Sequence, residues 1–341
     1  MSPEPTIFIQ VAAYRDPELE PTIADLLAHA EHPERLRFGI CRQFHPGDGF
    51  DRLDAYRDDE RFRIVDVLYT RTRGACWARH FVQQLYRDED FTLQVDSHMR
   101  AAPAWDTTLI GMLRDLQADG YPKPLITAYV PSYDPADDPG ARVLTPWRMR
   151  FDRFIPEGAV FFIPEPIPDH EALDRPVPAR FYSAHMAFTL GAFSREVQHN
   201  PEYYFHGEEI SIGVRAYTHG YDLFHPHRCV LWHEYTRKGR TKQWEDDEEW
   251  TARNDVSHQT NRQLFGMDGA EQRGHDGPYG FGESRTLDQF ERYAGMRFAD
   301  RSVQRYTLEA HTPPSPGPEA FDSEEGRRRS GSARPSRSCS G

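Results

Sequence analysis

The segment FTLQVDSHMR, residues 91–100, runs from an apolar stretch directly into Asp96, Ser97 and His98. Its apolar and β-branched residues predict a strand that ends at Asp96. In an open α/β sheet, the carboxyl end of a strand lies at the edge where ligands bind. A carboxylate and an imidazole two positions apart in a turn can both face one divalent ion. The stretch therefore predicts a metal-binding turn, and a strand-ending Asp beside a solvent-exposed His is the plain alternative.

The first half of the chain alternates β-branched and aromatic runs with segments of helical periodicity. This pattern is typical of an α/β fold whose helices cover both faces of the sheet. A Pro or Gly near each helix start supports the assignment. Strands are predicted at residues 6–12, 35–41, 62–69, 91–96 and 124–130, and helices at 17–32, 74–87 and 103–117.

The second half is richer in proline and less regular, beginning near Asp134. We expect an irregular region over 134–180, and then strands at 181–193 and 229–235 with helices at 208–220, 244–265 and 284–295. Residues 312–341 are rich in Pro, Ser, Gly and Arg without periodicity, which predicts a disordered tail. We expect one domain over 1–311, made of halves at about 1–133 and 134–311.

Composition restricts the class of protein. The formal net charge of −13 disfavours general binding to nucleic acid or anionic membranes. Four scattered cysteines, with no CxxC pair, indicate reduced thiols. Since the chain also has neither a signal-peptide pattern nor an apolar stretch of roughly 18 residues, a cytoplasmic location is expected. The motifs GxxxxGK[ST], HExxH and GxSxG are absent, which argues against the commonest NTPases, proteases and esterases.

Several ordered motifs together resemble the GlcNAc-type glycosyltransferases, whose best-known members are cytoplasmic hydroxyproline polypeptide N-acetylglucosaminyltransferases of protists. The motifs are IFIQVAAYRDPEL (7–19), TRGACWARHFVQQLY (72–86), QVDSHMR (94–100), HGEEISIGVRAYTHGYDLFHP (206–226) and VLWHEY (230–235). The resemblance implies a GT-A fold, a UDP-sugar donor and Mn²⁺ or Mg²⁺. It further implies transfer, with retention of anomeric configuration, of GlcNAc to a hydroxyl of a protein or peptide acceptor. The half over 1–133 would bind the nucleotide-sugar, and that over 134–311 the acceptor.

The third metal ligand is expected to be His233. The DSH triplet is similar to that of the polypeptide GalNAc-transferases, in which a later His completes the metal shell, and His233 matches that position. His225 and His227 flank a proline at metal-like spacing, but such pairs arise by chance among 16 histidines. A structural His that ends a strand is the rival interpretation. With Asp96 and His98, His233 would hold an ion that neutralises the leaving diphosphate.

Residues near two predicted strand ends and one helix start are candidates for donor binding. Tyr14, Arg15 and Asp16 follow the first strand, where a doubly wound sheet binds its nucleotide, although a turn into the next helix explains them equally well. Arg73 and Arg79 flank the helix start at Gly74 and suit phosphate or sugar hydroxyls, with surface charge as the alternative. The full predicted set is Tyr14, Arg15, Asp16, Arg73, Arg79, Asp96 and Ser97.

Glu208 and Glu209 are the predicted catalytic residues. Both begin a predicted helix, where acidic side chains complement the helix dipole, so capping is a complete structural explanation. The resemblance favours a role at the sugar or acceptor. For a retaining transfer, a carboxylate acts either as nucleophile or as stabiliser of an oxocarbenium-like state.

Two other functions compete with glycosyl transfer. A metal-dependent hydrolase would add His225 and His227 to Asp96, His98 and His233, and it would show two ions without a nucleotide pocket. A non-catalytic module that binds a nucleotide-sugar or a glycan would not hydrolyse the donor.

Overall fold

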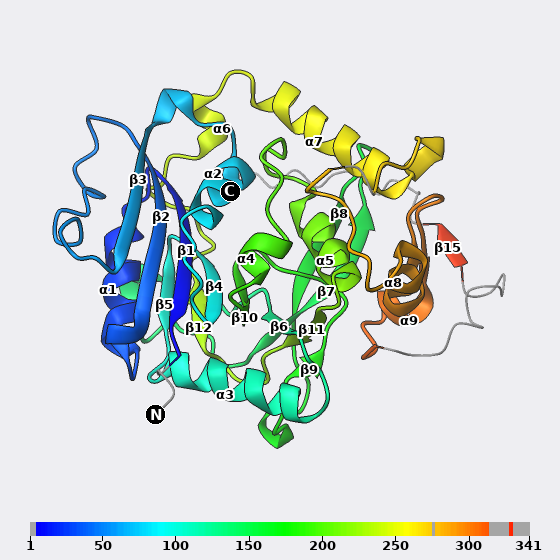
Figure 1. Ribbon diagram of the computed structural model, residues 1–341, viewed down its shortest axis with the longest axis horizontal. Helices are drawn as coiled ribbons and strands as arrows, with labels where there is room; N and C mark the ends of the chain where they lie inside the picture. The colour runs from blue at the N-terminus through cyan, green and yellow to red at the C-terminus, as the bar shows by residue number, and fades with distance from the viewer. Residues whose placement is uncertain (1–4, 275–276, 314–326, 330–341) are drawn as a thin grey trace.

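The computed structural model describes residues 5–274, 277–313 and 327–329 (Figure 1). Its central sheet has the order β3-β2-β1-β4-β10-β6-β11-β9. The strands are β1 (Ile7–Tyr14), β2 (Leu36–Phe44), β3 (Phe62–Leu68), β4 (Phe91–Asp96), β6 (Pro124–Thr127), β9 (Val177–Pro178), β10 (Met186–Leu190) and β11 (Asp222–His225). Strands β1 to β4 are mutually parallel, β6 is parallel to β11, and β10 runs antiparallel between β4 and β6. This mixed α/β sheet confirms the predicted fold class.

Helices cover both faces of the sheet. The apolar side chains of β1 point alternately to the two faces, and both faces must therefore be covered. Ile7 and Ile9 pack in the core that includes α1 and α3, whereas Phe8 faces α2 on the other side. The helices are α1 (Leu19–His29), α2 (Ala75–Gln83), α3 (Trp105–Ala118), α4 (Phe193–Glu196), α5 (Glu208–Thr218), α6 (Gln243–Asp246), α7 (Trp250–Phe265), α8 (Leu287–Ala294) and α9 (Arg305–Leu308). Single 3₁₀ turns lie at Pro33–Arg35, Tyr69–Arg71, Pro135–Asp137, His170–Ala172 and Met267–Gly269.

The region predicted to be irregular contains a hairpin. Strand β7 (Trp147–Phe154) pairs antiparallel with β8 (Val160–Pro166). The sequence WRMRFDRF of β7 alternates, so that Met149 and Phe151 enter a second apolar core beside α5, α7 and α8 while Arg148 and Arg150 do not. The surrounding prolines obscured this period of two, which is why the prediction was wrong here.

The predicted helix over 244–265 is in fact two helices. Helix α6 ends at Asp246, and Asp247 adopts an extended backbone with φ −117° and ψ 98° before α7 begins at Trp250. The break falls within five consecutive acidic residues, 245–249. Repulsion between like charges on one helix disfavours a continuous helix through this run.

Two short sheets complete the description. Strands β5 (Met99–Ala101) and β12 (Leu231–His233) form a ribbon, and β13 (Met296–Arg297) pairs with β14 (Ser302–Gln304). Most of the predicted tail, 312–341, lies outside the described residues. Within it, the three residues of β15 (Arg327–Arg329) are a strand paired with β14. No helix in the described part of the chain is long and apolar enough to cross a membrane.

Candidate active site

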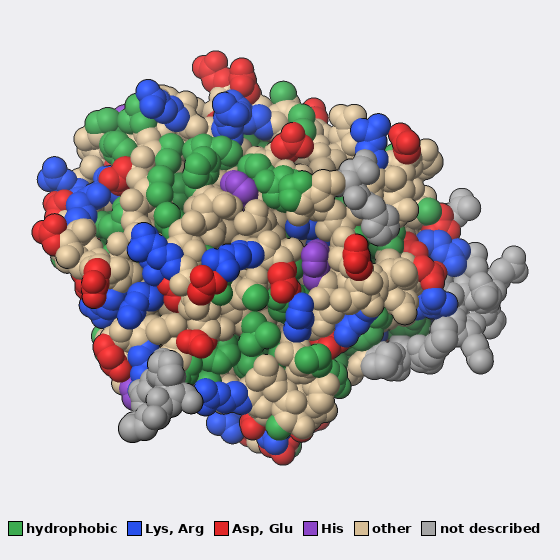
Figure 2. Space-filling model, viewed as in Figure 1, with side chains coloured by type: hydrophobic (Ala, Val, Ile, Leu, Met, Phe, Trp, Pro, Cys, Tyr) green, Lys and Arg blue, Asp and Glu red, His purple; other side chains and the backbone are tan. Residues whose placement is uncertain are grey.

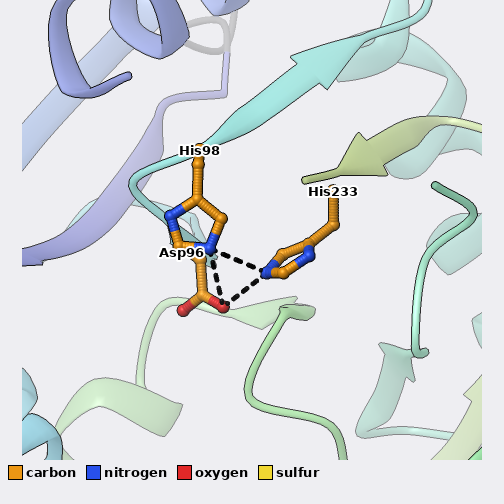
Figure 3. A group of neighbouring side chains, drawn as sticks. All are labelled: Asp96, His98 and His233. Atoms are coloured by element: carbon orange, nitrogen blue, oxygen red, sulfur yellow. Dashed lines mark hydrogen bonds and ion pairs between the residues drawn. The ribbon is translucent and has the colours of Figure 1, made fainter. Parts of the chain in front are cut away.

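Three side chains that are far apart in sequence converge at the carboxyl end of β4. Asp96 ends β4, His98 precedes β5, and β5 pairs with β12 so that His233 lies opposite Met99. His233 Nε2 is 3.1 Å from Asp96 Oδ2 and 2.9 Å from His98 Nε2, and His98 Nε2 is 4.0 Å from Asp96 Oδ2 (Figure 3). One ligand atom from each residue thus lies within 4.8 Å of the others.

The protonation states of Asp96 and His233 suit a divalent cation. Burial lowers the pKa of His233 to about 4, so its imidazole is neutral at physiological pH. Burial alone would raise the pKa of Asp96, but the contacts with His233 and Arg79 hold it well below the usual range. Metal ligation requires an ionised carboxylate and neutral imidazoles. One oxygen and two nitrogen donors are a set that Mn²⁺ accepts.

Asp16 lies behind the metal turn and orients it. Its side chain is buried, and Oδ2 accepts a hydrogen bond from Ser97 Oγ at 2.6 Å and lies 2.8 Å from His98 Nδ1. A carboxylate at Nδ1 of a ligating histidine keeps the lone pair of Nε2 directed at the metal. The side chains of Asp16 and Ser97, both predicted to bind the donor, therefore contact each other and His98, although both residues line the cavity described below.

Tyr14 and Arg15 are hydrogen-bonded to Asp246 of α6. Tyr14 Oη donates to Asp246 Oδ2 at 2.7 Å, and Arg15 Nη1 donates to the same oxygen at 2.7 Å. Arg15 Nε also donates to Asp48 Oδ2 at 2.7 Å. Tyr14 lines the cavity but Arg15 does not. Asp246 belongs to the acidic run 245–249, and its hydrogen bonds connect α6 to the end of β1.

Arg79 connects the metal turn to α5, whereas Arg73 does not take part. Arg79 Nη2 donates to Asp96 Oδ1 at 3.0 Å and Nη1 to Glu208 Oε1 at 3.2 Å. Arg79 is buried, and it lines the cavity. Arg73 is exposed and is not among the residues that line the cavity. Of the three predicted arginines, Arg15, Arg73 and Arg79, only Arg79 lines the cavity.

Gly74 allows α2 to begin in close contact with the backbone of Tyr204, and this start positions Arg79 beside Asp96. It has a φ of +115°, and an added Cβ would lie 2.4 Å from Tyr204 O. We expect Gly74→Ala to lower the free energy of unfolding by about 1–3 kcal/mol or more. The positive φ at this position and the clash with Tyr204 both oppose a side chain. Gly111→Ala is the control, since Gly111 lies within α3 with open space around it and should gain up to about 1 kcal/mol. Chemical denaturation measures both, and equal stability of the two variants would contradict the expectation.

Glu208 and Glu209 are both in the cavity but have different partners. Glu208 contacts Arg79, while Glu209 Oε2 accepts from Tyr129 Oη at 2.6 Å and Oε1 from the Ala184 amide at 3.0 Å. Burial raises the pKa of Glu209 to about 8, and the neighbouring Glu208 contributes to this rise. Burial also raises the pKa of Glu208, but Arg79 opposes this effect. The charge of the pair therefore belongs on Glu208 and the proton on Glu209.

His185 is a site residue that sequence analysis missed. Its ring stacks between Tyr129, with centroids 4.6 Å apart, and His233, with centroids 4.4 Å apart. Tyr235 Oη lies 3.2 Å from His185 Nδ1. The only sequence feature that could have indicated His185 was the strand predicted at 181–193, which contains this residue. Because β10 is antiparallel to β4, the start of β10 meets the end of β4 near Asp96.

Basic side chains on the segment after β12 form another missed part of the site. Arg240 Nη2 donates to Glu234 Oε2 at 2.7 Å, and Nη1 contacts His98 and lies 3.4 Å from Asp16 Oδ2. Arg237 and Lys242 also line the cavity. The segment thus places positive charge beside the predicted metal turn.

The cavity has a volume of about 450 Å³. It is bounded by the ends of β1 and β4, the starts of α2 and α5, strand β12 and the segment 237–244. Phe161 and Phe162 of β8 contribute an apolar wall, together with Phe205 and Trp244. On the face seen in Figure 2, basic and acidic side chains are interspersed, without a continuous basic surface. The space suits a ligand with charged and apolar parts.

His225 and His227 lie elsewhere. His225 Nδ1 is hydrogen-bonded to Thr127 O at 2.7 Å, and its Nε2 accepts from the Met149 amide at 3.3 Å. Neither histidine lines the cavity. In the part of the chain that the structure describes, the only group with metal-binding geometry is Asp96, His98 and His233. His225 and His227, the two ligands that the hydrolase interpretation would add, are therefore not at this site.

Comparisons with known proteins identify the family. The profile of the GlcNAc glycosyltransferase family matches residues 6–56 and 50–300. No curated protein sequence matches the chain. A crystal structure of GalNAc-T7 with UDP, GalNAc and Mn²⁺ superposes with a TM-score of 0.54 at 13% identity, covering 85% of this chain and 54% of that one. The chain thus spans about half the length of GalNAc-T7, and the shared fold confirms the GT-A prediction.

Two further solved structures are more distant. The mannosyltransferase PcManGT of Pyrobaculum calidifontis, with GDP-Man and Mn²⁺, has a TM-score of 0.45 at 12% identity, covering 70% of this chain and 59% of that one. TarS of S. aureus, with UDP-GlcNAc, has a TM-score of 0.42 at 12% identity, covering 71% and 61%. The family profile covers most of the chain, and so the protein belongs to the GlcNAc glycosyltransferase family.

Proposed function

We propose that the protein transfers GlcNAc from UDP-GlcNAc to a hydroxyl of a protein or peptide acceptor, with retention of configuration. The observation that carries the proposal is the convergence of Asp96, His98 and His233 on the wall of a 450 Å³ cavity in a chain of this family. These three residues would hold Mn²⁺ or Mg²⁺, which neutralises charge on a departing diphosphate. The GalNAc-T7 structure, which contains UDP and Mn²⁺, supports this reading. The cytoplasmic location stays a prediction.

The other cavity residues are suited to the remaining parts of such a donor. Arg237, Arg240 and Lys242 place positive charge where it would stabilise the two phosphates. Tyr14 offers an aromatic ring at the end of β1, where a doubly wound sheet binds a base. Glu208, which accepts a hydrogen bond from Arg79, would stabilise positive charge that develops on the sugar ring. The apolar wall of β8 faces the same cavity and would contact the acceptor.

A screen of UDP-, GDP- and dTDP-sugars for metal-dependent hydrolysis tests the proposal most directly. We expect UDP-GlcNAc to release UDP only with a divalent ion. Peptides containing hydroxyl side chains would then be profiled with that donor. A donor that binds but is neither hydrolysed nor transferred would identify a binding module instead.

UDP should bind more tightly than GDP. The expectation rests on the family and on the aromatic ring of Tyr14 and the carboxylate of Asp16, which both line the cavity at the end of β1. Calorimetry with each nucleotide in Mn²⁺ should give at least about a tenfold preference, equivalent to about 1.4 kcal/mol. Equal or reversed affinities would contradict the uridine assignment while leaving glycosyl transfer itself open.

A further inference from the structure

Helix α7 buries a polar face. The residues of this face recur every three or four positions, which places them on one side of the helix, and none is more than 6% exposed. They are Asn254, Ser257, His258 and Asn261. Burial of polar side chains is unfavourable unless they have hydrogen-bond partners. The apolar residues with which α7 enters the second core, Leu264 and Phe265, lie in its last turn. The position of the rest of the helix therefore depends on what its polar face contacts.

The polar face contacts segment 203–207, which directly precedes α5. Ser257 Oγ accepts a hydrogen bond from the Tyr204 amide at 2.8 Å. One turn earlier in α7, Asn254 Oδ1 accepts from the His206 amide at 3.2 Å. Both amides lie outside the helices and strands, and a buried backbone amide without an acceptor is costly. The two side chains of α7 therefore supply acceptors that the segment itself lacks.

Asn254 also holds the ring of His206. Because Oδ1 of Asn254 accepts from a backbone amide, its Nδ2 is the donor, and Nδ2 lies 3.1 Å from His206 Nδ1. Burial lowers the pKa of His206, which favours the neutral ring whose Nδ1 can accept this bond. The main chain and the side chain of His206 are thus both fixed by one residue of α7.

The segment is held tightly on two sides. Asn261 Oδ1 accepts from Tyr203 Oη at 2.7 Å. Gly207 has a φ of +93°, and an added Cβ would lie 2.3 Å from Asn261 Nδ2, so the backbone approaches α7 as closely as a glycine permits. On the side of α2, the Ala75 amide donates to Tyr204 O at 2.8 Å. The segment is therefore fixed between α7 and the start of α2.

This segment forms part of the wall of the catalytic cavity. Residues 204–207 line the cavity, and Glu208 follows them as the first residue of α5. None of the residues Trp250–Phe265, which the structure describes throughout, lines the cavity. The expected metal ligands lie on β4, the turn after it and β12. The contacts of α7 therefore bear on the wall and on Glu208 rather than on the metal ligands.

We propose that Asn254 and Ser257 are positioning residues of the active site, which hold segment 203–207 and thereby place Glu208 at the cavity. The inference rests on the proposed function and adds to it a helix that does not itself line the cavity. Without these hydrogen bonds, Glu208 would spend less time where it can stabilise charge on the sugar. The metal turn and the end of β1 would keep their positions. We therefore expect kcat to fall while UDP binding stays unchanged.

Full-length Asn254→Ala and Ser257→Ala test the proposal with UDP-GlcNAc and Mn²⁺, at a temperature well below the Tm of each variant. In each variant kcat for UDP release should fall by about tenfold to a hundredfold. Calorimetry should give an affinity for UDP that matches the wild type. Leu264→Ala is the control for general destabilisation, because it removes core packing from the same helix. Its Tm should fall at least as far as those of the polar variants, while its kcat matches the wild type.

Hydrogen–deuterium exchange gives a second measurement that does not require activity. The amides of segment 203–207 should exchange faster in Asn254→Ala and Ser257→Ala than in the wild type, and at the wild-type rate in Leu264→Ala. If Asn254→Ala does not fold, Ser257→Ala, which removes a single hydroxyl, carries both measurements. A wild type that releases no UDP contradicts the proposed function, whereas the exchange rates still report whether α7 holds the segment. Wild-type kcat or unchanged exchange in both polar variants overturns the positioning role, as does an equal loss of kcat in Leu264→Ala.

Discussion

Replacing Asp96, His98 or His233 by Ala should weaken UDP binding in Mn²⁺ by on the order of a hundredfold, and change it little in EDTA. The structure gives the physical reason, because the ligand atoms of all three residues lie within 4.8 Å and each would supply one bond to the ion. Loss of one ligand removes the charge neutralisation of the diphosphate, and UDP release from the donor should fall at least as steeply. Calorimetry of each variant with and without metal measures the effect.

Two controls make this result specific to the metal. Asp16→Asn keeps all three ligands but weakens the support of His98 Nδ1, and so should reduce metal affinity by roughly tenfold to a hundredfold. Asp54→Ala changes an exposed carboxylate outside the cavity and should leave UDP binding unchanged. If the three Ala variants lose affinity equally with Mn²⁺ and with EDTA, the cluster is not a metal site.

Local patterns in the sequence predicted most of the sheet, because β1, β2, β4 and β6 are mostly buried and therefore consist of short apolar runs. The strand that ends at Asp96 is an example, since its apolar run and its polar end are contiguous. The hairpin β7–β8 was missed because the prolines in and around β8 obscured the alternation of its residues. Its burial depends on α7 and α8, which come about a hundred residues later in the chain.

The candidate site was predictable where the chemistry is local and less so where it depends on pairing between distant strands. Asp96 and His98 share one turn, and the family resemblance selected His233. The proximity of His185 depends on the antiparallel placement of β10, which no short motif encodes. The ion pairs of Arg15 with Asp48 and Asp246 are likewise tertiary contacts. They hold the Arg15 side chain away from the predicted nucleotide position.

Glu208→Gln should reduce UDP release from the donor by about 10²–10³-fold, whereas Glu209→Gln should cost no more than about tenfold near pH 7. Arg79 contacts Glu208 and not Glu209, so the negative charge that can stabilise the sugar resides on Glu208. Glu209, with a pKa of about 8, is mostly protonated at pH 7, and the amide of Gln resembles that neutral form. Tyr129 Oη, which donates to Glu209, can instead accept from the amide.

The pH dependence of stability provides a test of this assignment that does not require activity. Since the pKa of Glu209 is raised in the folded state from 4.5 to about 8, its contribution is fully present below about pH 4.5 and is lost as the pH rises to about 8. Glu209→Gln removes that loss, so its Tm relative to the wild type should increase from about pH 5 to about pH 8 and stay constant above. Glu271→Gln, whose side chain is 79% exposed, should show no such trend. If Glu208→Gln shows the trend and Glu209→Gln does not, the proton and the charge are on the opposite carboxyls. If both variants release UDP at the wild-type rate, neither carboxylate acts on the sugar.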